Sequence, residues 1–91
     1  MATKYVLFYG SDAEARAKAP AYLAEHSARG SAFHDRGELI MYGPFTNPGE
    51  GAMSVFRTCE AAEEFARGDP FVLNGIVHRW HVREWLEAFS D

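Results

Sequence analysis

The pattern of apolar and polar positions divides this 91-residue chain into six segments that predict strands and helices. Residues 3–9 are rich in β-branched and aromatic side chains and stop at Gly10, which is typical of a buried strand. A proline is tolerated in the first turn of a helix but not in its middle. We therefore expect the main helix to begin near Pro20 and to end at Arg36-Gly37, with residues 12–19 forming a lead-in turn.

Beyond the first helix, the pattern predicts two strands and a second, shorter helix. Residues 38–42 and 52–57 have strand character, and the intervening 43–51 segment is a loop rich in Gly and Pro. Thr58 is a suitable N-cap for a helix over residues 60–67, whose first turn is acidic.

The last segment, residues 75–85, predicts a long strand, and residues 86–91 a loose end or short turn. Its alternation places one set of side chains, Ile76, His78, Trp80 and Val82, opposite a second set, Val77, Arg79, His81 and Arg83. The element order is that of the ferredoxin-like split βαβ fold (βαββαβ). This α+β fold has a four-stranded antiparallel sheet with two helices on one face, and we expect one such domain over residues 1–91.

Aromatic content suggests that the other face of this sheet is covered by a second copy of the chain. Seven Phe, four Tyr and two Trp are many for 91 residues. We expect the face without helices to be apolar, and an uncovered apolar patch of that size marks an interface. The prediction is a homodimer packed sheet to sheet.

Charge and cysteine content narrow the class of partner. The net charge is -4 and the nine basic residues form no run, so neither nucleic acid nor an anionic membrane is an expected partner. We expect a small-molecule ligand instead. No apolar run is long enough for a signal peptide or a membrane span, which predicts a cytoplasmic protein. The single cysteine, Cys59, reads as a small residue at a helix start rather than as a nucleophile.

Two residues stand out as candidates for chemistry. Asp69 lies between Gly68, suited to a left-handed helix end, and Pro70, which fixes the start of a new turn, so its carboxylate has a defined direction. It could simply cap that turn, or it could serve a site. His26 lies on an apolar stripe of the first helix, which comprises Tyr22, Leu23, His26, Gly30, Phe33 and Gly37.

A histidine on an inward stripe must be hydrogen-bonded or border a cavity. We therefore expect His26 and Asp69 to be hydrogen-bonded at the edge of a pocket. Gly30, one turn after the histidine, would let a strand or ligand approach closely, whereas Arg29 and Arg36 lie elsewhere on the helix and should be solvated, as should Glu25.

Other candidates allow two interpretations each. Tyr9, Tyr42, Phe45 and Phe71 could line the pocket or belong to the core. His34 could join the pocket or be a surface histidine near a helix C-terminus. On a strand His78 and His81 would point to opposite faces, so we expect no metal site there. The sequence has neither a phosphate-binding glycine loop nor a nucleophile motif, and we expect no cofactor.

Taken together, these positions resemble the YCII-related (YciI-like) family over nearly the whole chain. The residues that carry the resemblance are His26, Arg36 to Phe45, Gly51-Ala52-Met53, Glu60 to Glu64, Asp69-Pro70-Phe71, Gly75 and Val82 to Trp85. Similarity to this family implies a dimeric ferredoxin-like fold (a dimeric α/β barrel), akin to muconolactone isomerases, with a His–Asp active site at His26 and Asp69. One departure is that the stretch before the helix histidine, often more basic in the family, is alanine-rich here around Arg16 and Lys18. The resemblance thus gives no support for a substrate anion contact there.

Two classes of function follow. The first is a small cofactor-free enzyme in which a His26–Asp69 pair transfers protons in an isomerisation or an elimination such as dehydrochlorination, on a small ring-derived or aromatic compound. The second is a noncatalytic ligand-binding or interaction module, in which the same hydrogen bond holds the helix to the following corner. A solvent-reachable cleft at His26 favours the enzyme.

Overall fold

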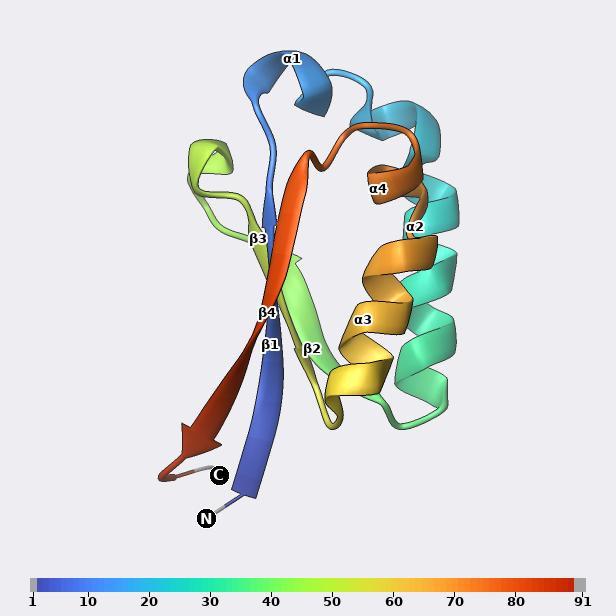
Figure 1. Ribbon diagram of the computed structural model, residues 1–91. Coiled ribbons are helices and arrows are strands. Elements are labelled where there is room, and N and C mark those ends of the chain that lie inside the picture. The colour runs from blue at the N-terminus through green and yellow to red at the C-terminus, as the bar shows by residue number, and fades with distance from the viewer. Residues whose placement is uncertain (1, 90–91) are drawn as a thin grey trace.

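The computed structural model describes residues 2–89 and has the predicted α+β ferredoxin-like architecture. Four antiparallel strands form one sheet in the order β2-β3-β1-β4. Helices α2, α3 and α4 lie on one side of this sheet, and α1 lies at its end (Figure 1). The elements are β1 (Ala2–Gly10), α1 (Ala13–Arg16), α2 (Ala19–Asp35), β2 (Leu39–Pro44), the 3-10 turn η1 (Pro48–Glu50), β3 (Ala52–Phe56), α3 (Cys59–Gly68), α4 (Pro70–Leu73) and β4 (Arg79–Glu87).

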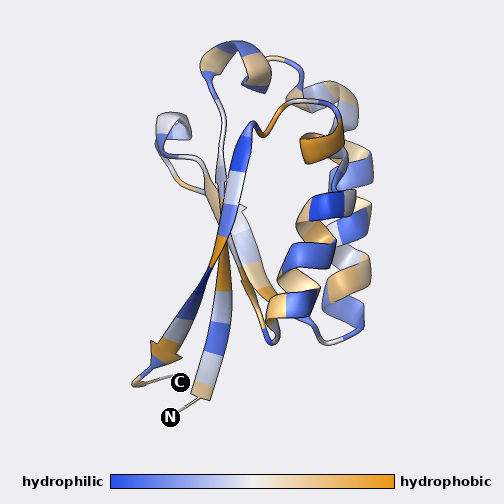
Figure 2. Cartoon of the chain, in the orientation of Figure 1, coloured by the Kyte–Doolittle hydropathy of each residue, from blue (hydrophilic) through white to orange (hydrophobic). Residues whose placement is uncertain are grey.

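Strand β1 is central because it pairs with both β3 and β4. Its alternation sends Leu7 and Tyr9 into the core beneath the helices, where Phe33, Phe56 and Phe65 pack against one another. Figure 2 shows α4 in hydrophobic colours, while α2 and α3 alternate between hydrophilic and hydrophobic bands, as expected for helices with one buried side.

The start of the first helix follows the prediction. Asp12 caps α1 by accepting a hydrogen bond from the Ala15 N–H at 2.7 Å, and α2 has Pro20 in its first turn. At Gly30 a Cβ would lie 2.6 Å from the Tyr42 hydroxyl oxygen. The close approach of a strand residue is what the missing side chain permits.

The last strand begins later than predicted. Residues 75–78 are not part of β4, because Gly75 takes a left-handed φ of 75° after α4, and the N–H groups of Ile76 and Val77 both donate to the Phe71 carbonyl. Both side chains are buried in this turn. Conversely, Leu86 and Glu87, predicted to be a loose end, extend β4 through pairing with β1.

The prediction that Gly68 adopts a left-handed conformation is also wrong. Gly68 is the last residue of α3, and Asp69 follows with a φ of -69°. The Arg29 guanidinium occupies the space above Gly68, where a Cβ would clash with its Nη2. Arg29, expected to be solvated, donates to the carbonyl oxygens of Glu64 and Phe65 and so links α2 to the end of α3.

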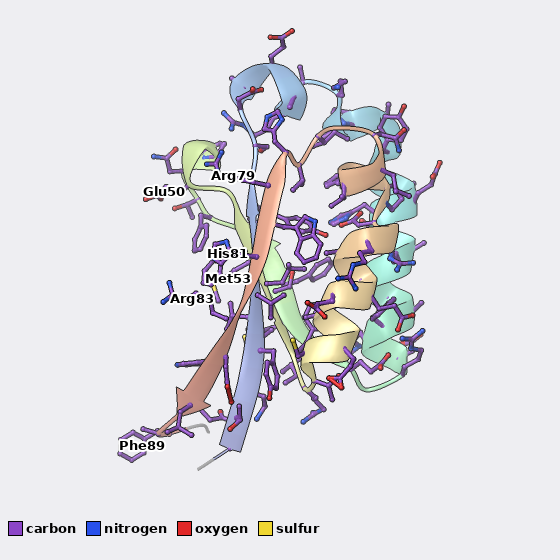
Figure 3. All side chains as sticks on the ribbon, in the orientation of Figure 1. Glu50, Met53, Arg79, His81, Arg83 and Phe89 are labelled. Atoms are coloured by element: carbon purple, nitrogen blue, oxygen red, sulfur yellow. The ribbon has the colours of Figure 1, made fainter. Side chains whose placement is uncertain are left out.

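The face of the sheet without helices is mixed rather than apolar. Figure 3 shows Met53, Arg79, His81 and Arg83 on the side away from the helices. Phe8 stacks on His81 there, with ring centroids 5.2 Å apart. The expected apolar face therefore carries several basic groups. Within residues 2–89, none of the helices has the length and apolar character that crossing a membrane requires.

Candidate active site

His26 and Asp69 meet between α2 and the corner that joins α3 to α4. The His26 Nδ1 lies 2.8 Å from Asp69 Oδ1 and 3.0 Å from Oδ2, which confirms the predicted hydrogen bond. A carboxylate only accepts, so Nδ1 carries the hydrogen in this contact. The Asp69 side chain is fully buried, whereas that of His26 is 14% exposed. The pair thus has a buried side and an open side.

Asp69 is held by two further donors. Its Oδ2 accepts from the Tyr9 hydroxyl at 2.6 Å, and its Oδ1 accepts from the Phe71 N–H at 3.0 Å. The second bond is the N-cap of α4, so Asp69 both caps this helix, as predicted, and accepts the hydrogen bond from His26. A carboxylate with partners on both oxygens can stay buried because its hydrogen-bonding capacity is used.

The imidazole plane of His26 is fixed by aromatic neighbours. Phe71 stacks on it with ring centroids 4.0 Å apart and an interplanar angle of 4°. Tyr42 lies at 5.8 Å on a tilted plane, and the edge of Phe65 completes the surroundings at 6.2 Å. Because Nδ1 is bound to Asp69 and the ring is stacked on Phe71, the direction in which Nε2 points is fixed. Among residues 2–89 it has no hydrogen-bond partner.

Tyr9 supplies the buried end of a Tyr–Asp–His chain. Burial raises the pKa of the Tyr9 phenol above its ordinary value, and the negative charge of Asp69 and the hydrogen bond to it raise that pKa further. Tyr9 therefore stays protonated and donates to the carboxylate at neutral pH.

The open side of His26 borders a cavity of about 340 Å³, which Tyr42 and Phe71 also line. A larger cavity of about 670 Å³ lies next to it and is lined by Phe45, Arg16, Ile76 and Val77 among others. The two cavities adjoin, because both are lined by Tyr9, Pro44, Ala52 and Phe71. The cleft is mostly apolar, and the His26 side chain forms part of its wall.

The structure separates the sequence-predicted candidates. Tyr9, Tyr42 and Phe71 lie around His26, and Phe45 lies in the adjoining cavity. His34 is exposed near the end of α2 and lines neither cavity, so it is not a pocket residue.

The remaining histidines and the cysteine lie elsewhere. His78 precedes β4 and contacts Asp12, while His81 lies on the open sheet face. No group of three metal-ligating side chains occurs among the described residues. Burial and nearby glutamates raise the pKa of the Cys59 thiol, which opposes formation of a nucleophilic thiolate.

Two contributors were missed by sequence reasoning. Arg16 lines the larger cavity, although the alanine-rich stretch around it gave no support for a substrate contact. Leu23 lines the cavity at His26, and its place one turn before the histidine on the same stripe was the available signal.

The fold and the site define a class: small ferredoxin-like proteins with a buried His–Asp pair opening on an apolar cavity. More narrowly, the chain belongs to the YCII-related domain family, whose pattern it matches over residues 3–86. It is 27% identical over 96 residues to Protein YciI of Escherichia coli O6:H1, a match that covers 93% of this chain and 98% of that protein. Protein YciI of Shigella flexneri matches to the same extent.

Solved structures show the same fold at low identity. The 5-chloro-2-hydroxyhydroquinone dehydrochlorinase TftG of Burkholderia phenoliruptrix AC1100, in complex with 2,5-dihydroxybenzoquinone, superposes with a TM-score of 0.75 at 15% identity. The match covers 93% of this chain and 95% of TftG. Rv0793 of Mycobacterium tuberculosis superposes with a TM-score of 0.54 at 17% identity, covering 97% of this chain and 96% of that one.

Proposed function

We propose that this protein is a small enzyme that transfers protons on a small aromatic or ring-derived compound, with His26 as the general base and acid and Asp69 as its partner. The observation that carries the proposal is the asymmetry of His26: Nδ1 is bound to a fully buried carboxylate, while the ring borders a cavity. A histidine held in this way presents Nε2 to a ligand in one tautomer.

The chemical step requires only these groups and the substrate. His26 Nε2 accepts a proton from a substrate carbon or hydroxyl, and the electrons of that bond form a new double bond. In an elimination the leaving group, such as chloride, departs with its bonding pair; in an isomerisation the imidazolium returns the proton to another carbon. Asp69 stabilises the imidazolium by its charge, and no cofactor is needed for such a step.

The neighbourhood of His26 supports a ring-shaped substrate. The walls of both cavities are predominantly aromatic and aliphatic, and the Phe71 ring lies parallel to the imidazole at the junction between them. The similar fold of TftG, a dehydrochlorinase bound to a benzoquinone, supports elimination on such a ring.

Two assays test the proposal. Chloride release from 5-chloro-2-hydroxyhydroquinone tests elimination, and exchange or migration of a ring proton of muconolactone, followed by NMR in D2O, tests isomerisation. We expect one of them to show turnover that His26→Ala removes. Equal rates for the wild type and His26→Ala in both assays would contradict the proposal.

A noncatalytic ligand-binding module is the second candidate, and one observation favours it. Asp69 accepts from Tyr9, His26 and the Phe71 N–H, so the pair also ties β1, α2 and α4 together. In that case a ligand would bind in the same cavity without being changed, and His26→Ala would alter affinity alone.

We further propose that two copies associate through the open sheet face. Met41 and Trp85 are 61% and 48% exposed, and the stacked Phe8 and His81 lie on that face. Apolar side chains of this size on a sheet surface are typical of an interface. Light scattering at micromolar concentration should give the mass of a dimer, and a monomer mass would contradict this.

A further inference from the structure

We infer that Arg16 is the substrate-anion contact of the cleft, and that the natural ligand is a small ring compound with one carboxylate. This inference rests on the proposed function for the reacting end, at His26. The other end of the ligand would lie in the larger cavity of about 670 Å³. Among the described residues that line this cavity, Arg16 is the one charged residue. A single cation in an otherwise apolar cavity selects a ligand with one anionic group and an apolar body.

Local bonds hold Arg16 at the wall of this cavity. Arg16 is the last residue of α1, and its Nη1 donates to the Ser11 carbonyl oxygen at 2.9 Å. Ser11 also lines the cavity. One bond leaves most of the five guanidinium N–H groups for another acceptor, and two of them match the geometry of a carboxylate.

The Ala15 N–H and, to a smaller extent, the charge of Arg16 lower the pKa of the Asp12 carboxyl, so Arg16 interacts with one protein carboxylate without forming an ion pair with it. Within residues 2–89, no ion pair includes Arg16. The nearby carboxylate of Asp12 is already engaged by the Ala15 N–H and by His78. No Asp or Glu among the described residues lines either cavity, since Asp69 is fully buried behind His26. An anion entering the cleft would therefore meet a cation and no opposing charge at its wall.

Arg16 and His26 line two adjoining cavities. Arg16 lines only the larger cavity and His26 only the smaller, and the four residues that line both form the junction: Tyr9, Pro44, Ala52 and Phe71. A ring at this junction would lie against Phe71 and Tyr9. Its carboxylate would point to Arg16 and its reacting bond to His26 Nε2, so Arg16 would fix which ring atom meets the base.

Binding of a matched pair of probes tests the inference without turnover. The probes are 4-hydroxybenzoate and 4-hydroxybenzamide, which share ring and size and differ in charge, titrated into the full-length protein at pH 7.5 and low salt. We expect the wild type to bind the benzoate more tightly. Arg16→Gln should weaken benzoate binding by about tenfold or more through loss of a charge-assisted bidentate contact, and leave benzamide binding nearly unchanged. Arg16→Lys should retain part of the preference.

Lys18→Gln is the matched control. Lys18 lies two residues after Arg16 and carries the same charge, but its side chain lines neither cavity. The inference is wrong if Lys18→Gln weakens benzoate binding as much as Arg16→Gln does, if Arg16→Gln weakens both probes equally, or if the wild type binds neither probe at millimolar concentration. His26→Ala separates the two proposals: retained Arg16-dependent preference in that variant supports the anion contact even if no turnover is found. Conversely, turnover that needs His26 but is insensitive to Arg16→Gln upholds the enzyme and overturns the anion contact.

Discussion

Two aspartates in this protein each cap a short helix and each bind a histidine, but the two pairs differ in burial and in the ring nitrogen that the aspartate contacts. Asp69 caps α4 and holds His26 at 2.8 Å; Asp12 caps α1 and lies 3.0 Å from His78. The two contacts are alike in type and length. They differ in surroundings, because the His26 and Asp69 side chains are 14% and 0% exposed and those of His78 and Asp12 are 40% and 64% exposed.

The two aspartates also contact different ring nitrogens of their histidines, and this decides which nitrogen remains for a ligand. At His78 the Nε2 itself faces Asp12, both the carboxylate and the backbone N–H, and no aromatic ring is stacked on the imidazole among the described residues. At His26 the aspartate takes Nδ1, and Phe71 fixes the plane, so Nε2 remains for a ligand. A His–Asp contact becomes a catalytic candidate when the carboxylate is desolvated and the second nitrogen borders a cavity.

The largest expected effect is on turnover. His26→Ala should lower kcat by about 10²- to 10⁴-fold, the usual contribution of a general acid–base group. His78→Ala, which breaks the exposed pair, should leave kcat within about twofold, since an exposed ion pair contributes little and this one borders neither cavity. Steady-state rates on the substrate found by the two assays measure both. Comparable losses in the two variants would contradict the assignment of His26.

Substitution of the two aspartates should show the same contrast, with a larger effect at Asp69 than at Asp12. Asp69→Asn replaces one carboxylate oxygen by an NH2 donor. The amide oxygen can keep the Oδ1 position, to which His26 Nδ1 and the Phe71 N–H donate, and the NH2 group then faces the Tyr9 hydroxyl. His26 can then keep its hydrogen on Nδ1, but the negative charge that would stabilise the imidazolium is lost, and the Tyr9 hydroxyl loses its acceptor. We expect a folded protein destabilised by about 1–3 kcal/mol, with reduced turnover.

Asp12→Asn is the control, because the cap survives with asparagine and the site is solvated. It should change the free energy of unfolding by less than about 0.5 kcal/mol. Denaturant unfolding measures the stabilities, and steady-state rates measure turnover. Wild-type turnover in Asp69→Asn would rule out a role for the carboxylate charge.

Among the variants of the His26 site, Tyr9→Phe should have the smallest effect, and the size of this effect should depend on pH. Loss of the hydroxyl leaves buried Asp69 with one donor fewer, at a cost of about 1 kcal/mol near neutral pH. The pKa of Tyr9 is raised in the folded state, so the folded protein keeps this proton above about pH 10 while the unfolded chain loses it. The stability contributed by Tyr9 is therefore present below about pH 10 and is lost as pH rises above it.

The difference between the wild type and Tyr9→Phe should accordingly narrow between about pH 9 and pH 11. Tyr5→Phe is the matched control on the same strand, since the Tyr5 hydroxyl makes no hydrogen bond among residues 2–89. Urea unfolding across this pH range measures the effect. A constant difference at all pH values would show that Tyr9 acts through packing and not through its proton.

Much of this architecture is readable from local patterns. The apolar run at residues 3–9, the stripe through His26 and the Gly and Pro positions predict the element order, because side-chain periodicity reports which face of an element is buried. The pairing of His26 with Asp69 was predictable since the stripe points inward and Pro70 fixes the corner. The late start of β4 was missed because buried Ile76 and Val77 mimic a strand while they pack in a turn.

Periodicity does not reveal which residue of another element a buried side chain will meet, since crossovers and strand register decide that. Tyr9 reaches Asp69 across 60 positions because β1 is the central strand beneath the α3–α4 corner. Gly68 is a glycine because Arg29 from α2 occupies the space above it. Arg16 lies in α1, between β1 and α2, and borders the larger cavity. No local pattern distinguishes it from a solvated arginine. These long-range contacts form only when the helices pack on the sheet, and they bring the Asp69 cap of α4 and the His26 face of α2 together at the candidate site.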